Sequence, residues 1–168
     1  MLYSQVVNVE RAIIGAGTEH IVFASHNPNY VLKRPRRANR LVHVLTRTNA
    51  HTVKGDINHT QLIVAELEDI RVPETRVFPR GSSYIIAQRR IHDDGTTDIG
   101  RVLATHADVF LQERYHIKPQ NFLSTQGIVY IVDPTKSPRT RIFEIFGIDE
   151  FAFIRIRRHF RKKIRYDD

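Results

Sequence analysis

The chain has 168 residues, and 26 lysines and arginines against 18 aspartates and glutamates give it a formal net charge of +8 at pH 7. This length suits one domain or one two-lobed domain, and a hydrophobic share of 41% supports a packed core, which excludes a wholly disordered chain. The absence of cysteine excludes disulfides, cysteine-ligated zinc, iron–sulfur clusters and a cysteine nucleophile.

The hydrophobic residues are not arranged as a membrane anchor. The longest apolar runs are short, such as Ile128–Val132, whereas a membrane-spanning helix needs about 20 residues. The first residues lack a basic patch followed by an apolar stretch, so no signal peptide is expected. These features predict a soluble, cytoplasmic protein without a transmembrane segment.

The first half of the chain predicts a small β-sheet with one main helix. Gly15 and Gly17 form a turn between two β-leaning segments, and strands are expected at 6–14, 21–23, 30–33, 76–78 and 83–88. Helical spacing of apolar residues predicts a main helix over 57–70, preceded by a loop at 49–55 and a short basic helix at 38–48.

The second half predicts mostly helix with one small hairpin. The polar stretch His92–Thr97 is the expected boundary between two lobes. After it we expect a helix over 99–113, a loop with Pro119, a hairpin built from 122–124 and 127–132, and a closing helix. The expected fold is therefore α+β and two-lobed, with an N-lobe at residues 1–91 and a reduced C-lobe at 92–168.

Two basic clusters account for much of the charge, and the sequence pI is about 10.1. The segment 33–40 holds five basic residues, and 155–165 holds seven. The second cluster includes apolar residues at helical spacing, which predicts a closing helix that packs one stripe on the body. Its basic face could be solvated, bind a polyanion such as nucleic acid, lie on a membrane surface or dock an acidic protein partner.

Four features with a chemical interpretation follow one another along the chain. The Gly15–Gly17 turn could lay backbone amides over phosphates, and Lys33 on the next strand could place its ammonium beneath that turn. Glu66 on the main helix could orient Lys33 through an ion pair. Asn121 in a loop and Asp133 at a strand end could converge on one divalent ion, and such oxygen ligands suit Mg²⁺. The first three features also have a purely structural interpretation: the glycines as an ordinary hairpin turn, Lys33 as a solvated lysine and Glu66 as a surface carboxylate.

These segments resemble a minimal, divergent protein kinase-like domain. IGAGTEHIVF resembles the glycine-rich loop, YVLK the lysine-bearing strand, HIKPQNFL the catalytic loop, and VYIVDP the strand that leads into Asp-Phe-Gly. The wording around Gly15 is most similar to kinase-like domains of bacteria and their phages, including those in phage polyvalent proteins. The resemblance spans residues 13–135, and the catalytic-loop stretch is its most specific part.

The resemblance implies that the protein binds ATP and Mg²⁺. Lys33 would contact the α- and β-phosphates with Glu66 bracing it, Lys118 would stabilise the transferring phosphate, and Asn121 and Asp133 would hold magnesium. The remaining implied nucleotide-binding residues lie in the glycine-rich turn and in the hinge beside the adenine: Gly15, Gly17, Val22, Gln88 and Arg90.

The sequence departs from the kinase pattern at two places. His116 stands where typical kinases have the aspartate that orients the substrate hydroxyl, and a neutral imidazole could serve there as a base. Pro134 follows Asp133 in place of phenylalanine, and the segment after Thr135 is too short for the usual platform that holds a peptide. Three functions therefore stay open: an atypical Ser/Thr kinase-type phosphotransferase acting on a protein substrate, a pseudokinase that binds or regulates, and a basic nucleic-acid-binding protein.

Overall fold

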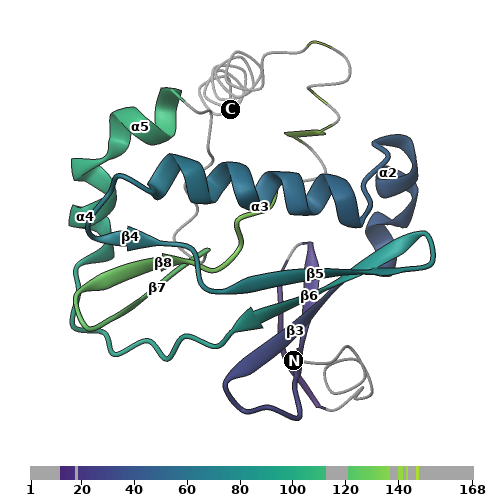
Figure 1. The fold of residues 1–168 in the computed structure, drawn as a ribbon, viewed down its shortest axis with the longest axis horizontal. Coiled ribbons are helices and arrows are strands. Elements are labelled where there is room, and N and C mark those ends of the chain that lie inside the picture. Colours follow the sequence, from purple (N-terminus) through teal and green to yellow (C-terminus); the bar gives the residue numbers. More distant parts are fainter. Residues whose placement is uncertain are drawn as a thin grey trace, which may run out of the picture.

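A computed structural model gives the structure of residues 12–17, 19–112 and 121–136, together with Thr140, Arg141, Phe143 and Gly147. The described chain is α+β, with an antiparallel five-stranded sheet in the order β1-β2-β3-β6-β5 and a three-stranded sheet in the order β4-β8-β7 (Figure 1). The strands are β1 (Ile13–Ala16), β2 (His20–Ala24), β3 (Tyr30–Pro35), β4 (Ile70–Arg71), β5 (Thr75–Arg80), β6 (Ser83–Arg89), β7 (Phe122–Thr125) and β8 (Ile128–Ile131).

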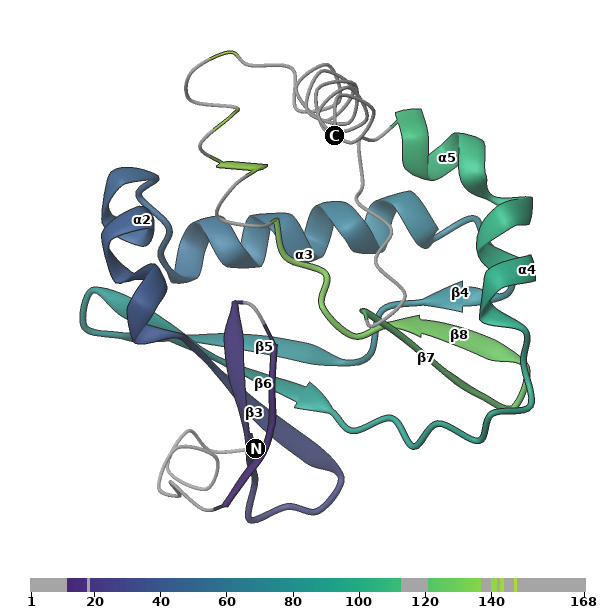
Figure 2. The ribbon, with the colours of Figure 1, turned by 180° about the vertical axis from the view of Figure 1, so that it is seen from behind.

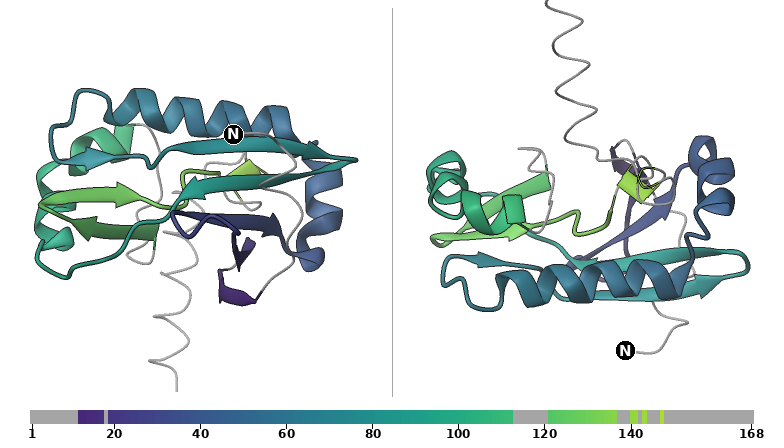
Figure 3. Two further views of the ribbon diagram at one scale, coloured as in Figure 1. Left: turned by 60° about the horizontal axis from the view of Figure 1, so that its bottom comes forward. Right: turned by 90° about the horizontal axis from the view of Figure 1, so that it is seen from above.

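The longest described helix, α3 (Ala50–Val64), connects the two sheets. It lies along one face of the five-stranded sheet and continues to the three-stranded sheet, where it contacts β4 (Figure 2). The short elements η1 (Arg37–Asn39) and α2 (Arg40–Leu45) lie at one end of α3, and α4 (Ile99–Thr105) and α5 (Ala107–Gln112) lie at its other end (Figures 1 and 3).

Helix α3 begins earlier and ends earlier than its apolar spacing predicts. Asn49 caps it, because its side chain accepts hydrogen bonds from the backbone of His51 and Thr52 while Thr52 Oγ1 accepts from the Asn49 N–H. The prediction of a loop at 49–55 is therefore wrong, since this capping box nucleates a helix that tolerates Gly55. Four residues at steps of four and three are buried against the sheets: Val53, Ile57, Thr60 and Val64.

The three-stranded sheet includes β4, a strand from the first half of the chain. Ile70, which the spacing places on the main helix, instead lies in β4 and pairs in parallel with Val129 of β8. Its side chain is fully buried in a core that also contains Leu103, Phe110 and Phe122. The expected lobe boundary at residue 91 therefore does not coincide with the division between the sheets, because Ile70 and Val64 complete the second core.

The five-stranded sheet is covered by α3 on one face only. Along β6 the side chains alternate, so that Tyr84 and Ile86 pack with α3 while Ile85 and Ala87 pack with Leu32 on the opposite face. This alternation decides which residues of the neighbouring strands face α3, and it is the basis of the site described below.

The polar stretch 92–97 is fixed to the β7–β8 hairpin by two aspartates. Asp93 Oδ1 accepts from Ser124 N at 3.2 Å and from Ser124 Oγ at 3.0 Å. Asp94 Oδ2 accepts from Gln126 N at 2.7 Å, and Asp94 Oδ1 accepts from Thr96 N and Thr96 Oγ1. These hydrogen bonds lower the pKa of Asp94 to about 2. The expected boundary segment 92–97 is therefore held to the hairpin by these hydrogen bonds. We call the contacts of Asp94 the Asp94 clamp.

We expect the Asp94 clamp to make stability depend on acid pH. Because the folded-state pKa lies below the ordinary 3.8, the carboxylate contributes its stability above pH 4 and loses it as the pH falls toward 2. Asp94→Asn should therefore unfold at a lower temperature than the unmodified protein at pH 5, and the difference should narrow between pH 4 and pH 3. Thermal melting followed by circular dichroism measures this; a difference that stays constant with pH would contradict it.

The predicted helix over 99–113 is divided in two. Its described part comprises α4 and α5, with His106 between them, and His106 Nε2 lies 2.7 Å from Asp69 Oδ1. The predicted closing helix with its basic face lies outside the described residues. Among the described residues, none of the helices is both long enough and apolar enough to cross a bilayer.

Candidate functional site

A cavity of about 670 Å³ lies between the first three strands and the segment that follows β8. We call it the Lys33 cavity. It is lined by the turn between β1 and β2, by residues of β2 and β3, and by the ends of the β7–β8 hairpin: Ala16, Gly17, Glu19, His20, Val22, Lys33, Arg36, Asn121, Val132 and Asp133. Five residues that the sequence singles out, Gly17, Val22, Lys33, Asn121 and Asp133, therefore line one cavity.

The register of the sheet places Val22 and Lys33 on the α3 side. Val22 pairs with Lys33, and Lys33 pairs with Ile86, which packs against α3. Residues directly opposite one another in neighbouring strands project from the same face. The strand β3 extends two residues beyond Lys33, so the lysine lies within the sheet rather than at a strand end.

Lys33 is buried and spans the gap between the two sheets. Only 8% of the residue is exposed, and its Nζ donates a hydrogen bond to the backbone carbonyl of Val132. Burial lowers the pKa of the Lys33 ammonium, and the neighbouring Asp133 carboxylate opposes that shift. The five-stranded sheet and the β8 end are thus linked through one positive charge.

The hairpin and α3 together hold Asp133 in place. Val132 N donates to the carbonyl of Asn121 at 2.8 Å, which closes the ends of the hairpin on each other. Thr60 Oγ1 of α3 donates to the carbonyl of Pro134 at 3.1 Å, and Thr135 Oγ1 donates to Asp133 Oδ1 at 3.0 Å. Asp133 therefore lies between two backbone hydrogen bonds, one to the start of β7 and one to α3.

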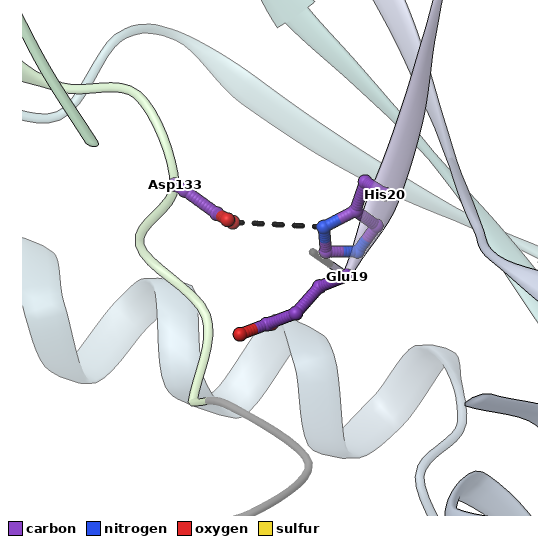
Figure 4. Close-up of side chains that lie close together, drawn as sticks. All are labelled: Glu19, His20 and Asp133. Carbon is purple, nitrogen blue, oxygen red and sulfur yellow. Dashed lines mark ion pairs between the residues drawn. The ribbon is translucent and has the colours of Figure 1, made fainter. Parts of the chain in front are cut away.

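Glu19 and His20 bring two further ionisable groups to Asp133 (Figure 4). One ligand-type atom from each of the three side chains lies within 4.8 Å of the other two, and His20 Nδ1 is 3.6 Å from Asp133 Oδ1. Behind the cavity, His20 Nε2 is 3.1 Å from the buried hydroxyl of Tyr84. Burial lowers the pKa of His20 to about 4, so its imidazole is neutral at pH 7.

Two buried nitrogens of the cavity have no hydrogen-bond partner among the described residues. They are His20 Nδ1 and Arg36 Nε. Buried polar groups are hydrogen-bonded in most native structures, so each such group calls for an explanation. One is a guanidinium N–H, which attracts anions. The other is an imidazole nitrogen, which can donate a proton or bind a metal ion depending on its tautomer.

Neither the backbone conformation nor the described neighbours require a glycine at position 17 in the cavity wall. Gly17 does not have a positive φ, and a Cβ added to it would come no closer than 3.9 Å to the described neighbours. Gly15 also leaves room for a side chain, since a Cβ there would lie 3.8 Å from Val22 Cβ, but Gly15 is not a lining residue. A molecule that lies against the turn would explain why residue 17 lacks a side chain.

The structure does not bring Glu66 to Lys33. Helix α3 ends at Val64, and Glu66 follows it in a turn with its side chain exposed. The expectation of a Glu66–Lys33 ion pair is wrong, because α3 ends at Val64, before Glu66, and the side chain of Glu66 is exposed to solvent. The carboxylate that acts on the pKa of Lys33 is Asp133.

The expected adenine-binding residues also lie away from the Lys33 cavity. Gln88 is two residues along β6 from the partner of Lys33, about 7 Å away, and its buried Nε2 donates to Thr75 Oγ1 at 3.1 Å. Arg90 is exposed and lines a separate cavity of about 330 Å³ beside Tyr30 and Glu74. Neither residue is among those that line the Lys33 cavity.

Three ionisable residues that line the Lys33 cavity were not predicted as site residues. Two predicted site residues lie outside the described part of the chain. His116 and Lys118, the expected catalytic residues, lie outside the described residues. Glu19 and His20 stand in the quoted segment IGAGTEHIVF without an assigned role, and Arg36 belongs to the basic segment 33–40, where it was expected to lie at the surface. Two adjacent ionisable residues between a glycine turn and a predicted strand were the available signal.

Comparisons with family models, with curated proteins and with the solved structures find no match for this chain.

Proposed function

We propose that this protein binds ATP together with a divalent cation in the Lys33 cavity and acts as an atypical kinase-like phosphotransferase. The observation that carries the proposal is the gathering of Gly17, Lys33, Asn121 and Asp133 around one cavity. In protein kinases a glycine-rich loop covers the phosphates, a lysine on the third strand contacts them, and an asparagine and an aspartate hold the metal ions. Here the same residue types occur in the same order along the chain, with Lys33 on the third strand of the sheet.

The charges of the cavity suit a nucleotide that carries a cation. Lys33 and the unpartnered Nε of Arg36 offer positive charge to phosphate oxygens. The carboxylate of Asp133 and the side-chain amide oxygen of Asn121 are hard donors for a divalent ion. A divalent ion bound there would neutralise phosphate charge. The volume of about 670 Å³ lies within the range of small-molecule sites, which is roughly 300–1,000 Å³.

A second candidate function, a nucleotide-binding module that does not transfer phosphate, is favoured by one observation. Active protein kinases need an ion pair between the strand lysine and a helix glutamate. Lys33 instead donates to the Val132 carbonyl, and Glu66 is exposed beyond the end of α3. The roles of His116 as base and Lys118 as phosphate ligand, and binding of a protein substrate, an acidic partner or nucleic acid by the basic C-terminal segment, stay predictions.

A titration of thermal stability with ATP and Mg²⁺ tests nucleotide binding. A ligand at 100 times its dissociation constant stabilises the folded state by about 2.7 kcal/mol, which for a chain of this size raises the melting temperature by roughly 5–10 °C. No shift at millimolar ATP with Mg²⁺ or Mn²⁺ would contradict both candidates. Transfer of labelled γ-phosphate to the protein itself or to a generic basic protein then separates them, because only the phosphotransferase yields labelled product.

A further inference from the structure

We propose that Glu19, His20 and Asp133 form a binding site for a divalent first-row transition-metal ion. The ligands are His20 Nδ1 and one oxygen from each carboxylate. This site shares Asp133 with the proposed nucleotide site, but it rests on the geometry of these three side chains and not on nucleotide binding.

The state of His20 is the first observation in its favour. The residue is 4% exposed, and Nδ1 points toward Asp133 without a hydrogen-bond partner among the described residues (Figure 4). If Nδ1 carries the proton, the 3.6 Å to Asp133 is too long for a hydrogen bond. If it does not, a buried lone pair faces a carboxylate. A cation between the two atoms would give His20 Nδ1 the partner that it lacks among the described residues.

The separations match those between ligands of one metal ion. Bonds of about 2.0–2.2 Å in tetrahedral geometry place two ligand atoms about 3.3–3.6 Å apart, and His20 Nδ1 and Asp133 Oδ1 are 3.6 Å apart. All three ligand-type atoms lie within 4.8 Å of one another, so Glu19 reaches the same ion with a shift of a few tenths of an ångström to roughly one ångström.

The surroundings of His20 supply the support that metal-binding histidines usually have. A ligating imidazole donates its second ring nitrogen to a neighbouring group, which fixes the ring orientation. Here Nε2 lies 3.1 Å from the hydroxyl of Tyr84, which is itself buried in β6.

The three donor atoms indicate which class of cation this site would prefer. Magnesium prefers oxygen ligands, whereas imidazole suits transition metals. One nitrogen and two carboxylate oxygens therefore favour ions such as Mn²⁺ or Zn²⁺ over Mg²⁺. Lys33 and Arg36 line the same cavity, so their positive charges oppose the ion, and we expect affinity for the metal alone to be moderate.

The test uses Mn²⁺ and the full chain without a histidine tag. Electron paramagnetic resonance should detect one bound ion per chain, and electron spin-echo modulation should show coupling to a directly bound ¹⁴N nucleus that changes on ¹⁵N-histidine labelling. Glu19→Gln and Asp133→Asn should each weaken binding at least tenfold, and His20→Gln should remove the nitrogen coupling. Glu66→Gln and His51→Gln, which alter an exposed carboxylate and an exposed imidazole, should leave both readouts unchanged.

Three results would overturn the site: no bound Mn²⁺ at millimolar concentration, bound Mn²⁺ without nitrogen coupling, or equal displacement by equimolar Mg²⁺. If His20→Gln does not fold, as judged by its melting curve, the coupling in the unmodified protein and the two carboxamide variants decide the matter. Lys33→Met separates this site from the nucleotide site. It removes a positive charge, so it should bind Mn²⁺ at least as tightly as the unmodified protein while binding ATP at least tenfold more weakly.

Discussion

Lys33→Met is expected to weaken the stabilisation by ATP and Mg²⁺ and to slow any phosphate transfer strongly. The lysine ammonium is buried, faces the cavity beside Asp133 and is linked to Val132. Its loss would delete the charge-assisted hydrogen bond to phosphate that the proposal assigns to it, which contributes about 1.5–3 kcal/mol, so nucleotide affinity should fall roughly 10- to 150-fold. Calorimetric titration with ATP and Mg²⁺ measures the affinity, and labelled phosphate transfer measures the activity, which should drop by about two to three orders of magnitude.

The matched control for this change is Lys54→Met, which removes an exposed lysine from α3. It changes the net charge equally but leaves the cavity intact, so ATP affinity should stay the same. Both variants should retain the circular dichroism spectrum of the unmodified protein. If Lys33→Met binds ATP as tightly as Lys54→Met does, the assignment of the nucleotide to this cavity is wrong.

Gly17→Ala is expected to weaken nucleotide binding without destabilising the fold. The chain leaves 3.9 Å to the nearest described atom for an added Cβ, so the free energy of unfolding should change by no more than about 1 kcal/mol. A phosphate that lies against the turn would meet the methyl group and lose a backbone contact, which lowers the affinity roughly tenfold. Chemical denaturation and ATP titration measure the two effects separately.

Gly15→Ala is the control for the glycine turn. Gly15 is also open to an added Cβ, but it pairs with Val22 in the sheet and does not line the cavity. Its substitution should therefore weaken ATP binding less than Gly17→Ala does. Equal effects of the two variants would show that the change acts through the sheet and not through contact with a ligand.

Local sequence signals predicted the strands better than the helices. The pairs β2–β3 and β5–β6 and the β7–β8 hairpin occur where alternating apolar residues and turn residues place them. At the hairpin, Gln126 and Gly127 both have positive φ, at 53° and 79°, which is the conformation of a two-residue turn that favours glycine. These features depend on neighbours in the chain, and so a single sequence reveals them.

The bounds of α3 show where local reasoning fails. Helical spacing joined Ile57 to Ile70 in one helix, but Ile70 is buried by pairing with β8, whose residues lie almost sixty positions later. An apolar residue can satisfy a helical period and a strand equally well, and only the remote partner decides between them. The same displacement removed Glu66 from the site, because its position depended on the helix continuing.

The residue types that a phosphate-and-metal site needs, and their order along the chain, were determined by the sequence alone: a glycine turn, a lysine after apolar residues, an asparagine and an aspartate at a strand end. Only the tertiary structure decided which of them meet. Pairing of β3 with β6 placed Lys33 on the α3 side, and the anchors from Thr60 and Val132 brought Asp133 and Asn121 to it. The structure also added Glu19 and His20. Long-range packing sets these side-chain directions, since the position of a residue in the chain does not state which distant residue it will face.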